Sequence, residues 1–449
     1  MLPTLSAVKE KLFEMLPRWP TSLHHDVLYL FLQRAVRMFA FGSSTLVLSL
    51  YLSALGNSDE AIGLFMMLTL AGDVAISAST SIVADAIGRR RILVLGSFLM
   101  ALSGVAFFSF DNFWVLLFAS IFGVISPSGG DVGPFKAVEE STLAQLLSAN
   151  DMHSVLAYYY MLGSWGAALG TISAGWLVQT MKNQGQQNLE AYRAVFLLYS
   201  VLGFIKICLS LKLSIKCEKS AMLVQRNDSQ SEEGNFLLEL ESENVLEFES
   251  DQNDETRLFS FSPSAKRIML RLCPLLVLDS LGTGLTNDSW LAYFMDHKFK
   301  PKSTTLGTIF SLMNFIESFS NIMAIPVVRW IGLINTIFCG HALSSTALFF
   351  FPFPQQLGGL IVLVIIRSIF FDFDQATRQT FVICSVLPQE RTVVMGAINM
   401  TRTLAQSLGP TVTGFLSSYG KLNFAFMCAG GLKWTYEILL LVTFGGTKL

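Results

Sequence analysis

Charged residues are scarce in this chain. Of its 449 residues only 14% are Asp, Glu, Lys or Arg, and 52% are hydrophobic. A soluble protein has about 25% charged residues, and its apolar residues lie on narrow stripes of its helices. Here they form long blocks instead, and a helix that crosses a bilayer needs about 20 mostly apolar residues. The composition excludes a soluble multidomain protein and predicts an all-α, polytopic membrane protein.

Residues and motifs for catalysis are equally scarce. The five histidines and six cysteines are scattered, without a CxxC pair, so we expect no metal site and no cofactor. No GxxxxGK[ST] motif is present, which excludes an ATP-driven pump. The net charge of -2 argues against nucleic acid as a partner. A membrane-embedded enzyme needs a His/Asp or His/Glu cluster at one depth, which the sparse histidines do not supply, so we expect no enzyme.

Twelve apolar spans follow from the hydropathy of the chain. A polar, acidic segment separates the first six from the last six, and its composition is typical of disorder. Basic residues flank this segment and form the run Arg89-Arg90-Arg91, so these loops and both termini are predicted to be cytoplasmic. We expect a cytoplasmic segment 1–26, a bundle 27–215, a linker 216–262 and a bundle 263–449. The predicted spans are 27–54, 60–84, 92–110, 113–140, 153–180, 192–213, 268–295, 304–328, 331–351, 357–384, 393–417 and 423–445.

The two halves repeat each other at an offset of about 240 residues. Glycines align in series, and so do two pairs of ionisable residues, Asp73 with Glu317 and Arg37 with Asp279. Parallel six-helix repeats joined by a cytoplasmic linker are a transporter plan, with the substrate site between them near the middle of the bilayer. The aligned glycines are Gly42 with Gly284, Gly63 with Gly307, Gly88 with Gly332, Gly96 with Gly340, Gly170 with Gly409 and Gly175 with Gly414.

The loop after the second span carries a motif. Residues 81–91 read SIVADAIGRRR, which resembles the GxxxDxxG[RK][RK] loop of the major facilitator superfamily, with Ser81 in place of the first glycine. Gly88 permits a tight turn. The resemblance implies twelve transmembrane helices in two pseudo-symmetric bundles. It also implies that Asp85, Gly88, Arg89 and Arg90 form a loop associated with gating.

Ionisable residues inside the spans are the candidate functional residues, because a charge near the bilayer centre costs several kcal/mol unless it meets a cavity or a partner. Asp73, Glu317 and Asp279 are candidates to take up a proton or bind a substrate cation. Arg37 is a candidate to hold an anion. The alternative for each is an internal salt bridge that only fixes the bundle geometry.

Two further candidates lie in the fourth and tenth spans. Asp131 lies in a Gly- and Pro-rich stretch followed by Glu139-Glu140, where it can meet the substrate or Arg37. The competing interpretation is a kinked cytoplasmic end with solvated acids. Arg367 lies in the middle of its span and requires a partner.

The function that these features predict is secondary active transport of a small polar molecule by alternating access, coupled to protons. Alternatives are an efflux antiporter for hydrophobic drugs, since 37 Phe and 17 Met supply an apolar cavity, and a nutrient sensor with a transporter fold. The expected partners are the bilayer, a small-molecule substrate and a proton, and the protein is expected to be a monomer. The sequence does not distinguish the plasma membrane from a vacuolar or endosomal membrane as the location of the protein.

Deleting residues 220–260 separates a transporter from a sensor, because the deletion removes only the acidic linker. A transporter retains most of its flux, whereas a sensor loses its signalling output. Flux and downstream signalling measured in the same cells check this expectation. A deletion that abolishes flux while leaving the protein correctly inserted would contradict the prediction.

Overall fold

In the described part of the chain, each predicted span contains at least one helix. The computed structural model describes residues 24–128, 134–147, 149–214, 217, 263–331, 333–371 and 391–444. The helices of the first half are α2 (His25–Ala54), α3 (Asp59–Ile87), α4 (Arg89–Ser109), α5 (Phe113–Phe122), α6 (Pro134–Leu146), α7 (Ala149–Asn183) and α8 (Asn188–Leu211). Those of the second half are α10 (Pro263–Leu285), α11 (Asp288–Phe299), α12 (Ser303–Ile331), α13 (Leu333–Phe350), α14 (Leu357–Phe371), α16 (Arg391–Ser418) and α17 (Leu422–Phe444).

Two of the predicted spans are broken rather than continuous. The span predicted at 113–140 is interrupted where α5 ends at Phe122, and α6 begins at Pro134, a residue that suits the first turn of a helix. The span predicted at 268–295 bends by 42° between α10 and α11. There the Asn287 side chain accepts a hydrogen bond from the Trp290 backbone N–H at 2.9 Å. This cap starts a new helix and ends the previous one.

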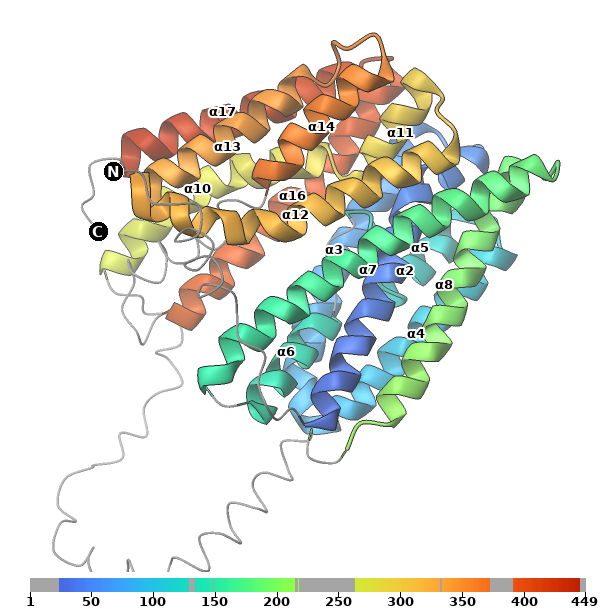
Figure 1. Ribbon diagram of the computed structural model, residues 1–449, viewed down its shortest axis with the longest axis horizontal. Coiled ribbons are helices and arrows are strands. Elements are labelled where there is room, and N and C mark those ends of the chain that lie inside the picture. Colours follow the sequence, from blue (N-terminus) through green and yellow to red (C-terminus); the bar gives the residue numbers. More distant parts are fainter. Residues whose placement is uncertain are drawn as a thin grey trace, which may run out of the picture.

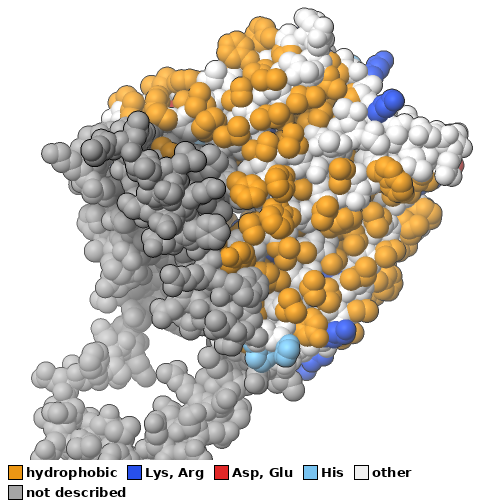
Figure 2. Space-filling model, viewed as in Figure 1, with side chains coloured by type: hydrophobic (Ala, Val, Ile, Leu, Met, Phe, Trp, Pro, Cys, Tyr) orange, Lys and Arg blue, Asp and Glu red, His pale blue; other side chains and the backbone are white. Residues whose placement is uncertain are grey.

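The outer surface is apolar. Six described helices are long and apolar enough to cross a bilayer, and the bent pair α10–α11 adds a seventh. Figure 2 shows hydrophobic side chains spread over the described part of one face, with basic side chains at its ends. The protein is therefore an integral, multi-pass membrane protein. Large exposed apolar side chains include Phe98, Leu102, Trp114, Phe118, Trp176, Phe204, Val362, Phe415 and Val442.

The helices pack as two bundles with matching contacts (Figure 1). In the first bundle α2 packs on α7 and α8, and α4 packs on α8; in the second α10 packs on α16 and α17, and α13 packs on α17. Between the bundles α3 packs on α16, and α7 packs on α12. Each contact has its equivalent under the repeat, which explains why the same glycines recur in both halves.

Glycines make the contacts between the bundles close. A Cβ atom at Gly414 would lie 2.4 Å from the carbonyl oxygen of Asp59 and 3.0 Å from the Cα of Gly63. A Cβ atom at Gly307 would lie 2.6 Å from the carbonyl oxygen of Thr171 and 3.0 Å from the Cα of Gly175. Small residues let membrane helices approach to backbone contact. The glycines that the repeat aligns thus form both crossings, Gly63 with Gly414 and Gly307 with Gly175.

Polar contacts between the bundles are concentrated at the same end of the helices, opposite the Arg89–Arg91 turn, and one hydrogen bond, from the Trp165 indole to the Ser318 hydroxyl at 3.3 Å, lies near the middle of α7 and α12. Asp59 accepts hydrogen bonds from the hydroxyls of Tyr293 at 2.7 Å and Ser417 at 2.5 Å. The Lys182 Nζ donates to the Ser303 hydroxyl at 3.3 Å. The sequence predicts that the arginine turn lies on the cytoplasmic side, and the bundles are joined at the opposite end, which is called the non-cytoplasmic side below. In Figure 1 α7 and α12 diverge away from this end.

A bulky residue at the glycine crossing is expected to hold the non-cytoplasmic side open. Gly414→Leu places a side chain where the backbone of α3 lies, so closure of the bundles there is blocked. The measurement is the rate at which an impermeant thiol reagent modifies a cysteine placed at Ser289, in a variant without the native cysteines. Ser289 is buried and hydrogen-bonds to the Thr45 carbonyl of the other bundle.

We expect the modification rate from the non-cytoplasmic side to rise at least about tenfold. Gly396→Leu is the matched control, because it lies on the same helix and a Cβ atom there meets nothing within 4 Å. An unchanged rate in a correctly folded Gly414→Leu protein would show that this crossing does not control access.

Candidate transport site

The first bundle holds a completely buried ion cluster around Glu139 of α6. Arg37 of α2 donates a hydrogen bond to Oε2 of Glu139 at 2.6 Å, and the Tyr159 hydroxyl of α7 donates to the same oxygen at 2.5 Å. The Nζ of Lys206 on α8 lies 3.4 Å from the other oxygen, and the side chains of all three ions are 0% exposed. Arg37 is thus bound in a salt bridge inside its own bundle.

Glu139 corrects one interpretation of the sequence, that the acids after the Gly- and Pro-rich stretch are solvated. Glu140 fits that interpretation better, since it accepts a hydrogen bond from the exposed Tyr160. Glu139 is one residue away on a helix, so it points about 100° around the axis, into the bundle. Asp131, the other candidate of this stretch, lies outside the described residues.

Arg34, one turn from Arg37 on α2, lies against aromatic rings. Its guanidinium carbon is 4.2 Å from the centre of the Tyr159 ring and 5.0 Å from that of Tyr160. Gly163 provides the space, because a Cβ atom there would lie 2.5 Å from the Arg34 Nε. Cation–π contacts of a desolvated guanidinium contribute about 2 kcal/mol each. This aromatic pair therefore stabilises a third cation beside the Glu139 cluster.

The second bundle holds a different ion cluster around Asp279 of α10. The Nζ of Lys433 on α17 donates to Oδ1 of Asp279 at 2.7 Å and to the Thr283 hydroxyl at 2.8 Å. Arg402 of α16 lies 4.0 Å from the other oxygen of Asp279. Asp279 therefore meets two cations in its own bundle, and the repeat-related pair Arg37 and Asp279 is not brought together.

A histidine and a second acid complete this cluster. The Nδ1 of His341 on α13 lies 3.1 Å from Oε1 of Glu437 on α17 and 3.9 Å from Oδ1 of Asp279. The Tyr436 ring meets the His341 ring edge-on at 6.0 Å. Both His341 and Glu437 are buried. The cluster thus joins α10, α13, α16 and α17.

The remaining membrane candidates lie on α3, α12 and α14. Asp73 is buried on α3, and Asp73 and Arg37 both interact electrostatically with Tyr199. Glu317 on α12 is half-buried and accepts a hydrogen bond of 3.4 Å from the Ser368 hydroxyl of α14. The neighbouring Arg367 is buried, its guanidinium lying 4.5 Å from the Phe371 ring centre. One of its terminal nitrogens, Nη1, has no hydrogen-bond acceptor among the described residues.

The loop between α3 and α4 is held to α6 and to the end of α8, on the side predicted to be cytoplasmic. Gly88 has a φ of 106°, which only glycine adopts readily. Arg89 donates to the Ser141 carbonyl at 3.1 Å and the Gln145 side chain at 2.8 Å, both on α6. Arg90 donates to the Leu211 carbonyl at the end of α8 at 2.5 Å. The dipole of α8 also favours a cation at this C-terminal end. The side chain of Asp85 lies outside the described residues.

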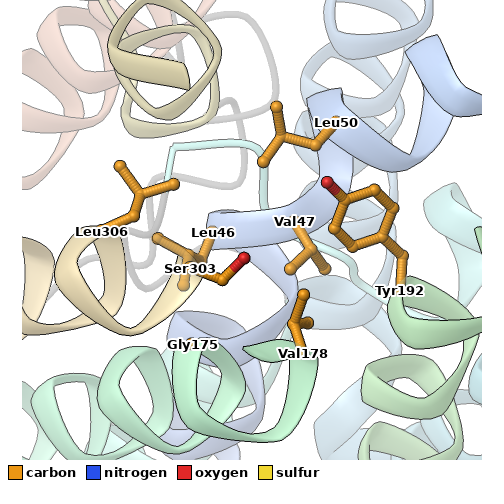
Figure 3. Close-up of a pocket in the computed structure, with 8 residues that line it drawn as sticks. All are labelled: Leu46, Val47, Leu50, Gly175, Val178, Tyr192, Ser303 and Leu306. Atoms are coloured by element: carbon orange, nitrogen blue, oxygen red, sulfur yellow. The ribbon is translucent and has the colours of Figure 1, made fainter. Parts of the chain in front are cut away.

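The recess shown in Figure 3 is a packing defect rather than a substrate cavity. It lies between the bundles and is lined mainly by apolar side chains, including Leu46, Val47 and Leu306. Its volume of about 10 Å³ holds at most one water molecule. This small volume shows that α2, α7 and α12 pack closely at the end of the helices opposite the Arg89–Arg91 turn.

Several residues of the two clusters are absent from the candidates that the sequence yields. They are Glu139, Tyr159, Lys206, His341, Arg402, Lys433 and Glu437. Two signals were available. Lys206 interrupts the apolar run Phe204–Cys208, and Lys433 and Glu437 lie one turn apart within the last apolar span.

Comparisons with known proteins agree with this architecture. The sequence model of the Major Facilitator Superfamily matches residues 30–228. An uncharacterized membrane protein of Saccharomyces cerevisiae is 32% identical over 426 residues, covering 94% of each chain. The chain belongs to the major facilitator superfamily, and it is a membrane transporter.

Solved structures share the fold at low sequence identity. The nucleoside transporter NupG superposes with a TM-score of 0.66 at 15% identity, covering 95% of this chain and all of that one. A bacterial homologue of the iron transporter ferroportin in an inward-facing state gives a TM-score of 0.68 at 12% identity, covering 94% and 99%. A bacterial homologue of the lysosomal transporter Spinster, also inward-facing, gives 0.65 at 13%, covering 93% and 94%.

Removing the Glu139 charge is expected to destabilise the first bundle strongly. Glu139→Gln leaves Arg37 and Lys206 buried without their counter-ion, and breaking a buried pair costs about 3–5 kcal/mol. Thermal unfolding of the purified protein in detergent measures the loss. Glu140→Gln is the matched control and is expected to change the melting temperature little.

A second variant tests the cause. Adding Lys206→Met to Glu139→Gln removes one of the uncompensated cations, so part of the lost stability returns. Equal melting temperatures for Glu139→Gln and Glu140→Gln, or no recovery in the double variant, would contradict the ion-cluster interpretation.

Proposed function

We propose that this transporter carries a small anionic or zwitterionic molecule by alternating access and couples its movement to protons. The observation that carries the proposal is the unequal distribution of contacts between the bundles. Their glycine crossings and polar contacts lie at the non-cytoplasmic end, while ionisable side chains lie deeper along α3, α12 and α14. Two bundles joined at one end can rock about a site near the middle of the membrane.

Arg367 and Glu317 support a polar substrate with a negative group. They come from neighbouring helices, α14 and α12, and the Ser368–Glu317 hydrogen bond ties these helices together beside Arg367. A guanidinium nitrogen that is buried without an acceptor in the described part of the chain is costly. A carboxylate or phosphate of the substrate would satisfy it by a charge-assisted, bidentate contact. Glu317, half-buried, then faces the positive group of a zwitterion.

Acids inside the membrane support proton coupling. Asp73, Asp279 and Glu317 are buried or half-buried, and a carboxylate in such surroundings exchanges a proton when its counter-ion moves. Arg37 has a different role, because Glu139 and Tyr159 already satisfy it. We assign Arg37 to holding α2 and α6 together.

Substrate binding and transport test the proposal in sequence. A thermal-shift screen of the purified protein against anionic and zwitterionic metabolites finds a ligand, since binding at 100 times Kd stabilises by about 2.7 kcal/mol. Flux of that ligand into proteoliposomes is then measured with and without an imposed pH gradient. Flux that ignores both the gradient and a protonophore would rule out proton coupling.

Substitution of Arg367 tests the substrate site. Arg367→Gln is expected to weaken ligand binding at least about tenfold, because a hydrogen bond to a charged group contributes about 1.5–3 kcal/mol. Arg367→Lys retains the charge and is expected to lose less. Arg271→Gln, at an exposed position of α10, is the control. Unchanged ligand binding by Arg367→Gln would show that Arg367 is not part of the substrate site.

A further inference from the structure

The two bundles bury their charges in chemically different ways. The first bundle neutralises Glu139 with Arg37 and Lys206, and an arginine does not release its proton in proteins. The second bundle places an imidazole between two carboxylates, with His341 3.1 Å from Glu437 and 3.9 Å from Asp279. Histidine is the side chain whose ordinary titration falls between pH 5 and 8. The second bundle therefore holds the group suited to bind and release a proton.

We propose that His341 is the proton-binding residue of the second bundle, with Glu437 and Asp279 as its counter-ions. The inference rests on the proton coupling of the proposed function and adds a residue that lies on a different helix from the acids named there. The ligand of the site is a single proton, which Nδ1 of His341 exchanges with the oxygens of the two carboxylates.

The charges around His341 favour such an exchange. Asp279 and Glu437 contribute two negative charges, and Lys433 and Arg402 contribute two positive ones. With a neutral imidazole the formal charge of this group is zero. An added proton makes it positive, and the cost is lowest where two carboxylates lie within 4 Å of the imidazole.

The groups that contact His341 in the described part of the chain lie on α10, which contributes Asp279, and on α17. From α17 come Glu437, Tyr436 and, through Asp279, Lys433. The helices α12 and α14 also pack on α13. Their mid-membrane ionisable groups are Glu317, which accepts from Ser368, and Arg367, which lies over Phe371.

A route to the surface follows from Arg402. Its side chain is 33% exposed, whereas those of Asp279 and His341 are 2% and 6% exposed. Arg402 lies 4.0 Å from Asp279 Oδ2, and the other oxygen of Asp279 lies 3.9 Å from His341. Asp279 is thus positioned between the partly exposed Arg402 and the buried imidazole. A proton from the aqueous side reaches His341 through the Asp279 carboxylate.

This arrangement couples protonation to helix packing. Lys433 shares Oδ1 of Asp279 with His341, so a protonated imidazole competes with the ammonium for the same oxygen. The hydrogen bond of 2.7 Å from Lys433 joins α17 to α10. Loading the proton weakens that link and strengthens the link between α13 and α10, which changes the packing of the second bundle.

Histidine NMR of the full-length protein tests the proposal directly, with the proton as the probe. The protein is labelled with ¹⁵N-histidine, placed in lipid nanodiscs and titrated from pH 5 to 8.5. Among the imidazole signals that titrate, we expect one to be missing in His341→Gln and present in His297→Gln. His297→Gln is the matched control on α11. In Glu437→Gln the same signal is expected to titrate about one pH unit lower, because a counter-ion of the imidazolium is gone.

The outcomes separate this inference from the proposed function. An imidazole of His341 that keeps one protonation state over the whole range, or a midpoint unmoved in Glu437→Gln, would overturn the inference whatever the flux. Titration of His341 together with flux that ignores a pH gradient would overturn the proton coupling alone. If His341→Gln does not fold, the shift in Glu437→Gln decides, with size-exclusion profiles as the folding control.

Discussion

An ion inside a bilayer has no water to solvate it, so each buried charge of this chain needs a partner from another helix. This requirement organises both bundles. Arg37 of α2, Glu139 of α6 and Lys206 of α8 meet at one point, and this point fixes how three helices of the first bundle pack. Removing the Glu139 charge leaves both Arg37 and Lys206 without their counter-ion, which makes the arrangement a strong constraint on the fold.

The second bundle also pairs its buried charges, but with different residues, and this difference affects how each bundle can move. The ions of the first bundle are completely buried and joined to one another across three helices, so this bundle is suited to move as a rigid body. The second bundle contains His341 and a lysine that shares an oxygen of Asp279 with it. Its packing can depend on protonation, while the glycine crossings provide the contact against which it moves.

The sequence predicted the helices and their contacts better than the ion clusters. Apolar blocks coincide with the described helices, and the aligned glycines Gly63, Gly175, Gly307 and Gly414 form the crossings between bundles because duplicated halves make duplicated contacts. The bend at Asn287 was not predicted, because hydropathy does not register a side chain that caps a helix.

The two ion clusters were not predicted from the sequence for a related reason. The aligned ionisable positions of the repeat are Asp73 with Glu317 and Arg37 with Asp279, and Glu139, Lys206, His341 and Glu437 are not among them. Glu139 lies 102 residues from Arg37, so nothing local indicates their contact. Only Asp279 was both a predicted candidate and a member of the second cluster. The ionisable residues that differ between the halves form the two clusters, and a comparison of repeated positions does not identify such differences.

The paired glycine crossings have a consequence for how the molecule divides. Because α3 meets α16 as α12 meets α7, each bundle presents the same two surfaces to the other, and the interface is isologous, as in a two-fold symmetric dimer. The covalent chain thus behaves as a dimer of its own halves. In such a dimer an identical pair of subunits carries identical sites. Joining the halves in one chain allows one half to hold an Arg–Glu–Lys ion cluster while the other holds a buried histidine between two carboxylates.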